Sequence, residues 1–220
     1  GTLLAQSWQN SGLTHSRTLL PLVDSMLKNC GASLKEVEVI AVAAGPGSFT
    51  GLRIGISAAK GLAWAAQRPC AGCSTLESMA WNLAGFSGQV CAAMDARRHQ
   101  IYNARFQVDG QCPRRLTPDR AISLDDLVQE LAGTQTPQLV VGDGAQLCYD
   151  ALTAAGIPAV LAPPNLRMQS AWGVARQALA LAQAGQTLSP AQLVPVYHRL
   201  SQAERERLER EQAAQTPHPQ

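Results

Sequence analysis

The sequence predicts an α/β fold in which helices flank mixed β-sheets. Short β-type runs alternate with helical patterns along most of the chain, and hydrophobic residues make up 46% of it, which is enough for a sizeable core. A glycine-containing stretch at 85–88 is followed by a section richer in strand patterns. We therefore expect two lobes, 1–87 and 88–200, and a charged tail at 201–220.

The predicted elements of the first lobe begin with a short strand at residues 3–8. Apolar residues at helical spacing then mark one helix face, which ends near Gly31, and Pro21 lies in the early turns of that helix or kinks it. Ser33 and Glu36 form a capping-box pattern for a short helix. The remaining expected elements are a strand at 39–44, a helix at 50–66, an extended segment at 68–73 and a helix from 74 to about 85.

The second lobe is expected to begin with two strands. A turn at Asp109-Gly110 has the composition of a hairpin turn. The tail alternates glutamate with arginine, which predicts a solvated helix with a frayed end. The expected elements are strands at 90–94 and 101–108, a helix at 123–131, a strand at 138–141, a helix at 145–155, a strand at 159–161 and an alanine-rich helix at 169–184.

Composition argues against several classes of protein. The formal net charge of +2 gives no strong field toward nucleic acid or membranes. Apolar runs fall short of the roughly 18 residues that a membrane span needs, and we expect a cytoplasmic protein with reduced thiols. Cys70 and Cys73 have C-x-x-C spacing without the second pair of a zinc ribbon, so buried or incidental thiols are favoured over redox or metal use.

The most informative segment is a glycine-rich turn between a predicted strand and a predicted helix. Its glycines permit positive φ, and its hydroxyl residues can cap the helix, so backbone N–H groups there suit an anion or a closely packed partner. A Walker A loop would need Gly-Lys-Ser/Thr, and a dinucleotide loop would need glycine in place of Thr50. A tight strand-to-helix connection is the simpler interpretation. The segment consists of Gly45, Pro46, Gly47, Ser48, Phe49, Thr50 and Gly51.

This segment and three others resemble one protein family. The run GPGSFTGLRIG is similar to the signature of the TsaB (YeaZ) family, a bacterial subunit of the machinery that makes threonylcarbamoyladenosine in tRNA. Segments 14–21 (THSRTLLP), 94–102 (MDAR with IY) and 195–199 (PVYHR) agree with it, so the resemblance spans nearly the whole chain. It implies the two-lobed actin-like architecture of sugar kinases and chaperones, with ribonuclease-H-like lobes; the older label is glycoprotease-like, or peptidase M22-like.

The resemblance also implies an incomplete first lobe. In the actin-like fold the first β-hairpin carries a phosphate-binding aspartate, and residues 1–5 resemble the third strand instead. We therefore expect the chain as given to start after that hairpin, about 20 residues into the fold. Central strands of the first sheet would then be absent, and backbone groups would be left unpaired.

Catalytic interpretations need a metal site or an activated nucleophile. The TsaD-type relatives carry two histidines four residues apart, whereas here Leu19 stands four residues after His15, so we expect a capping or interface role for His15 and no metal. Ser48 lies outside any G-x-S-x-G elbow. Because the four histidines, at 15, 99, 198 and 218, offer it no assignable base, a helix N-cap is the favoured role.

Two polar turns of the second lobe remain as candidate binding sites. Asp95 with Arg97, Arg98 and His99 would suit a phosphate or carboxylate, although a solvated turn explains them and is favoured. The resemblance implies that the other turn occupies the place where actin-like proteins contact adenosine; a plain strand-to-helix turn is its simpler interpretation. The candidate nucleotide-proximal residues there are Gly142, Asp143 and Gly144.

The helix at 50–66 is apolar on nearly all sides. Small residues at 51, 55, 59 and 63 form a stripe with almost no side-chain bulk. Such a helix is normally buried on more than one side. We expect its own sheet on one side and a helix of a second subunit on the other; burial between the two lobes of this chain is the alternative.

We therefore expect a non-catalytic scaffold that pairs with a TsaD-type transferase, which transfers threonylcarbamoyl to a tRNA adenosine. The resemblance also implies a TsaE-type ATPase as a second partner, and a homodimer when the chain is alone. It implies that tRNA is contacted only through the complex. ATP or ADP would bind at the complex interface, with no cofactor on the chain alone. Alternatives are a small ATP-dependent phosphotransferase and a metallopeptidase-like glycoprotease. The expected partner-contact residues are His15, Leu19, Leu20, Val23, Gly51, Arg53, Gly55, Ala59 and Ala63.

Overall fold

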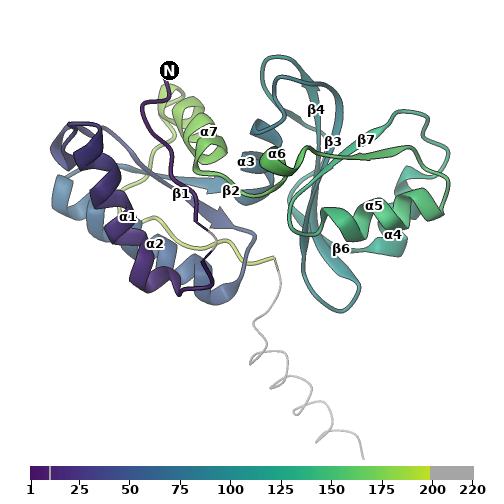
Figure 1. Cartoon of the computed structure of the whole chain (residues 1–220), viewed down its shortest axis with the longest axis horizontal. Coiled ribbons are helices and arrows are strands. Elements are labelled where there is room, and N and C mark those ends of the chain that lie inside the picture. The colour runs from purple at the N-terminus through teal and green to yellow at the C-terminus, as the bar shows by residue number, and fades with distance from the viewer. Residues whose placement is uncertain (10, 199–220) are drawn as a thin grey trace, which may run out of the picture.

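The computed structural model describes residues 1–9 and 11–198, which form two lobes built on separate sheets (Figure 1). The predicted α/β class, with mixed sheets flanked by helices, is confirmed. The predicted tail at 201–220 lies outside the described residues. Among the helices of the described part, none is long and apolar enough to span a bilayer.

The first lobe contains a parallel pair of strands between two helices. Strand β1 (Ile40–Gly45) pairs with β2 (Cys70–Ser74). Because alternate strand residues point to opposite faces, Cys70 packs under α2 (Phe49–Ala66) and Ala71 packs under α7 (Ala171–Gln183). The other elements of this lobe are α1 (His15–Asn29) and the 3-10 turn η1 (Leu34–Glu36).

The capping box predicted at the 3-10 turn is confirmed. The backbone N–H of Ser33 donates to the Glu36 carboxylate over 2.7 Å, and the Ser33 side chain accepts in return. This reciprocal pair lowers the pKa of Glu36, because the hydrogen bonds from Ser33 favour the ionised form.

The second lobe is a mixed sheet in the order β5-β4-β3-β7-β8, with β6 also paired to β4. Strands β3 and β4 are antiparallel, whereas β3, β7 and β8 run parallel to one another. The predicted Asp109-Gly110 turn connects β4 to β5, and Gly110 has a φ of +87°. The strands are β3 (Ser87–Asp95), β4 (Gln100–Asp109), β5 (Arg114–Arg115), β6 (Arg120–Ser123), β7 (Gln138–Val141) and β8 (Ala159–Leu161).

Helices cover both faces of the second sheet. Val90 and Ala92 of β3 face α3 (Thr75–Trp81), whereas Cys91 and Ala93 face α4 and α5. Helix α3 therefore belongs to the core of the second lobe as well as to the connection between the lobes (Figure 1). The helices on the far face are α4 (Leu124–Leu131) and α5 (Ala145–Ala154).

The chain then returns to the first lobe, so the predicted second domain at 88–200 mixes elements of both sheets. After α6 (Pro164–Arg167), helix α7 packs on β2 and α3. A Cβ on Gly173 would lie 1.8 Å from the Ser78 carbonyl oxygen, so glycine permits this close approach of α7 to α3. Leu188 forms an isolated antiparallel β-bridge with Cys70, and Leu193 packs in the core of the first lobe. No local sequence pattern signals this return.

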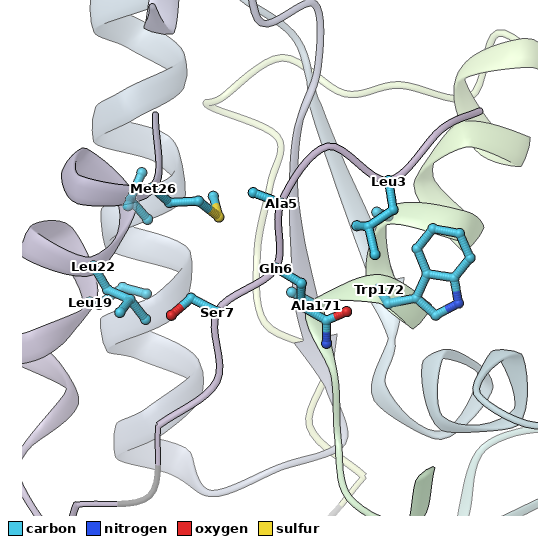
Figure 2. A pocket seen from close by; sticks show the side chains of 11 residues that line it. Leu3, Ala5, Gln6, Ser7, Leu19, Leu22, Met26, Ala171 and Trp172 are labelled. Atoms are coloured by element: carbon cyan, nitrogen blue, oxygen red, sulfur yellow. The ribbon is translucent and has the colours of Figure 1, made fainter. Parts of the chain in front are cut away.

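The predicted strand at 3–8 is wrong, because these residues form no strand ladder. A strand requires regular backbone hydrogen bonds to a neighbour, and this segment instead passes between α1 and α7 (Figure 1). There it lines an apolar cavity of about 290 Å³ together with Leu19, Val23 and Trp172. Figure 2 shows Leu3 beside Trp172 on one side of the segment and Met26 on the other.

Candidate partner-binding face and interlobe loops

The glycine-rich turn is a tight connection from β1 to α2. Ser48 is the N-cap of α2, and its hydroxyl accepts a hydrogen bond from the Gly51 N–H over 3.1 Å. A Cβ on Gly51 would lie 2.7 Å from that hydroxyl oxygen, and a Cβ on Gly47 would lie 3.2 Å from the side chain of Leu52. The capping role predicted for Ser48 is confirmed, and packing alone accounts for these two glycines.

The same turn is covered by the segment near the end of the described chain. The Val196 N–H donates to the Ala44 carbonyl oxygen over 2.8 Å. Gly45 has a φ of +143°, and a Cβ there would lie 2.2 Å from the Val196 carbonyl oxygen. Gly45 therefore permits both the backbone conformation and the close approach of this segment.

Side chains complete this contact. The Phe49 and Tyr197 rings stack, and the Arg53 guanidinium lies 3.9 Å from the Phe49 ring centroid. Arg53 Nε also donates to the Tyr197 hydroxyl over 3.2 Å. Arg53, expected as a partner contact, is thus engaged within the chain, although it remains exposed. The role of Tyr197 could not be read from spacing, because its partners lie far away in the sequence.

Helix α1 is the least buried helix of the first lobe, since none of its residues is buried. Its N-cap is Thr14, so the capping role expected for His15 is wrong. His15, Leu19, Gly51 and Gly55 instead line one cavity of about 170 Å³ between α1 and α2. The structure therefore brings these four predicted contact residues together.

The small-residue stripe of α2 points mainly into the first lobe. Ala59 and Ala63 are buried in the core beneath α2, where a partner cannot reach them in this structure. A Cβ on Gly55 would meet Val42 of β1 at 3.7 Å. The expectation that this stripe forms a partner surface is wrong for Ala59 and Ala63, because these small side chains let α2 lie close to its own sheet.

The exposed apolar residues lie elsewhere on these two helices. Leu20 of α1 is 49% exposed and Trp64 of α2 is 60% exposed. Trp64 is therefore exposed on a helix that its apolar composition predicts to be buried on more than one side. It borders a shallow groove of about 520 Å³ that Arg68 and Pro190 also line.

The turns of the second lobe meet at the carboxyl ends of β3 and β7. A Cβ on Gly142 would lie 2.0 Å from the Ala93 carbonyl oxygen, and one on Gly144 would lie 2.8 Å from the Asp95 N–H nitrogen. These glycines therefore serve the close packing of one turn on the other. Partial loss of hydration raises the pKa of Asp143, and the nearby charge of Asp95 raises it further, although Asp143 stays solvent-accessible. Two carboxylates here disfavour direct contact with a phosphate.

The cluster at 95–99 is the turn between β3 and β4. Arg97, Arg98 and His99 are exposed and all have positive φ, and the Arg97 N–H donates to the Asp95 carboxylate over 2.7 Å. The turn interpretation is confirmed. Residues 1–9 and 11–198 contain no group of three or more His, Cys, Asp or Glu that could hold a metal, and His218 lies outside them.

Comparison with known proteins identifies the family. A family model described as "TsaD: tRNA N6-adenosine threonylcarbamoyltransferase" matches residues 9–207. A Bacillus subtilis protein named tRNA threonylcarbamoyladenosine biosynthesis protein TsaB is 33% identical over 86% of this chain and 82% of its own length. The Escherichia coli protein of that name is 34% identical over 84% of this chain and 80% of its own. The chain belongs to the TsaB family.

Solved structures agree with this assignment. A Pseudomonas aeruginosa protein described as similar to peptidase YEAZ superposes with a TM-score of 0.70 and 27% identity, over 84% of this chain and 85% of that one. The structure titled YeaZ from Pseudomonas aeruginosa gives a TM-score of 0.66 at the same identity and coverage. The architecture expected from the TsaB resemblance is therefore confirmed.

Proposed function

We propose that this chain is a non-catalytic subunit in the biosynthesis of tRNA threonylcarbamoyladenosine, and that it binds a TsaD-type transferase through α1 and the adjoining part of α2. The names of its relatives support the pathway. The observation that carries the binding surface is the absence of any buried residue in α1. A fifteen-residue helix with an apolar face normally buries that face against a neighbour.

The surface has the composition of a protein interface. Leu19, Val23 and Met26 are only half-buried against their own lobe, and Leu20 projects beside them. Apolar side chains that are partly covered in one chain gain most from a partner that excludes the remaining water. A helical surface on the transferase would supply that cover.

The non-catalytic part of the proposal rests on how the candidate catalytic residues are used. The Ser48 hydroxyl caps α2, and Arg53 is held by Phe49 and Tyr197. Leu19 stands where a second histidine would be needed to pair with His15. The phosphotransferase and metallopeptidase alternatives therefore have less support than a binding role.

Co-elution with the transferase tests the proposal. Leu20→Glu places a charge on the proposed interface and should abolish co-elution, because desolvating that charge opposes association. Leu147→Glu on α5 is the matched control, since Leu147 is 45% exposed on the far lobe; it should leave co-elution intact. Loss of binding in both variants, or in neither, would contradict the proposed face.

The other expectations about assembly stay predictions. We propose that ATP or ADP binds only once the transferase is present, that a TsaE-type ATPase joins the complex, and that tRNA is contacted through the complex in the cytoplasm. Homodimerisation of the isolated chain would use the same α1 face. Nucleotide titration of the chain with and without the transferase tests the first of these, because binding to the isolated chain would contradict it.

A further inference from the structure

Two cysteines of the second lobe form a buried pair that the proposed function does not use. Cys91 lies on β3 and Cys148 on α5, and both are 0% exposed. Both belong to the same core cluster beneath α4 and α5, and each thiol shifts the pKa of the other. The two sulfur atoms are therefore neighbours in the folded chain, although distant in sequence.

The surroundings of Cys91 are unusually polar for a core cysteine. Asn103 Nδ2 donates to the Cys91 sulfur over 3.4 Å, and Arg120 holds Asn103 by donating to its Oδ1 over 3.1 Å. Arg105 is directly opposite Cys91 in the β3–β4 register, so it lies on the same face of the sheet. Arg105 Nε is buried without a hydrogen-bond partner among the described residues. A buried cysteine that serves only packing behaves as a small apolar group and needs none of these donors.

These groups distinguish the two thiols. Interaction with the Cys148 thiol lowers the pKa of Cys91, with further help from Arg105, Asn103 and Arg120, although burial opposes it. The same interaction and burial raise the pKa of Cys148. The hydrogen bond that Asn103 donates to the Cys91 sulfur favours the thiolate form at Cys91 over Cys148.

The C-x-x-C cysteines of β2 differ from this pair, because their sulfurs are not neighbours and burial raises the pKa of Cys73. Cys70 packs toward α2 and Cys73 toward α7, so their sulfurs lie on opposite faces of the sheet. The Cys73 thiol donates to the Val174 carbonyl oxygen over 3.5 Å. Burial and the charge of Glu77 raise the pKa of Cys73 to about 12. These cysteines provide an internal comparison.

We propose that Cys91 and Cys148 form an oxidation site for small peroxides, at which Cys91 reacts first and Cys148 closes a disulfide between β3 and α5. The Cys91 sulfur attacks one peroxide oxygen and the O–O bond breaks. The leaving hydroxide takes up a proton as water, and Cys91 becomes a sulfenic acid. The Cys148 sulfur then attacks the Cys91 sulfur, the S–O bond breaks, and the hydroxide leaves with the Cys148 proton as water. The two sulfurs together lose two electrons, and the peroxide is reduced to water.

Burial determines which oxidant can react. Hydrogen peroxide is close to water in size and can enter during local opening of the core. Oxidised glutathione is too large to reach sulfurs that are fully covered. The site should therefore form an internal disulfide without forming a glutathione adduct.

Hydrogen peroxide treatment of the folded chain tests the proposal. The exposed cysteines Cys30 and Cys112 are first replaced by serine to prevent links between chains. After treatment, unfolding and alkylation, we expect the loss of two alkylatable thiols, recovery of both on reduction, and a linked peptide pair containing Cys91 and Cys148. Treatment of the chain unfolded in urea should lose this selectivity.

Matched variants identify the roles. Cys148→Ala should leave Cys91 as an unlinked oxidised thiol, whereas Cys70→Ser and Cys73→Ser should keep the Cys91–Cys148 link. If Cys148→Ala does not fold, peptide mapping of the parent chain still shows whether Cys91 and Cys148 become linked. A link through Cys70 or Cys73, a sulfinic acid on Cys91 without any link, a glutathione adduct at either member of the pair, or two unmodified thiols would each overturn the proposal.

Discussion

The ring of Phe49 lies on the ring of Tyr197, with 4.7 Å between the ring centroids and 25° between the ring planes. Arg53 contacts both residues, through the Phe49 ring face and the Tyr197 hydroxyl. Phe49 begins α2, whereas Tyr197 lies near the end of the described chain. The glycine-rich turn is therefore held in its compact form by a segment distant in sequence.

Tyr197→Ala should destabilise the first lobe, because it removes the aromatic stack and the acceptor for Arg53. A stacked aromatic pair contributes about 0.5–1.5 kcal/mol beyond its buried area. Tyr197→Phe keeps the stack and loses only an exposed hydrogen bond, so its cost should be clearly smaller. Urea unfolding of both variants checks this, and equal costs would show that the stack contributes nothing measurable.

Gly45→Ala should lower the free energy of unfolding more than the addition of one methyl group suggests. The added Cβ would overlap the Val196 carbonyl oxygen, and the positive φ would also be strained. We expect a loss of more than about 1 kcal/mol in the free energy of unfolding. Gly61→Ala is the control: this glycine is exposed within α2 with open space around it, so alanine should stabilise by about 0.5–1 kcal/mol. Opposite signs in thermal melts would support this account, and two similar losses would contradict it.

Local chemistry allowed much of the first lobe to be predicted. The Ser33–Glu36 capping box and the Ser48 N-cap depend on residues three positions apart, and both form as expected. Strands β3, β4, β7 and β8 of the second sheet follow from short apolar runs in the same way, whereas β5 and β6 were not predicted because they contain no such run. The return of α7 to the first lobe depends instead on a long-range fit, in which Gly173 meets Ser78. Single-sequence patterns contain no information on such a fit.

The direction of the α2 stripe was the least predictable part of the candidate site. Small residues at four-residue spacing allow close approach, but the pattern cannot say whether the approaching element is a partner helix or the chain's own sheet. Burial of Ala59 and Ala63 shows that it is the sheet at that end of α2. Near Gly55 the neighbours are Val42 and the residues lining the cavity under α1.

Gly55→Leu should therefore affect folding before it affects assembly. A leucine between α2, β1 and α1 would overpack this region at a cost of about 1–3 kcal/mol. Gly55→Ala is the control, since its Cβ would make an ordinary contact with Val42. Thermal melts and co-elution with the transferase separate the two effects. Lost co-elution with an unchanged melting temperature would show that Gly55 faces the partner instead.

Asp143→Asn should stabilise the fold at neutral pH, because it removes a carboxylate whose ionisation opposes folding. Because the pKa of Asp143 is raised in the folded chain by lost hydration and by Asp95, folding favours its protonated form. That contribution is complete below the ordinary value of 3.8 and is lost as the pH rises through the folded pKa. Asparagine cannot ionise, so the variant should be more stable than the parent at neutral pH. The difference should shrink toward zero in acid.

Glu130→Gln is the control, because its expected effect on stability at neutral pH has the opposite sign. Burial raises the pKa of Glu130, but hydrogen bonds from Arg105 and Arg120 outweigh this and lower it overall. Its ionised form therefore stabilises the fold at neutral pH, and that stabilisation is lost as the pH falls through the folded pKa. Glu130→Gln should be less stable than the parent at neutral pH, with a gap that also closes in acid. Urea unfolding across this pH range distinguishes the two residues. Lower stability of both variants at neutral pH would mean that folding does not raise the pKa of Asp143.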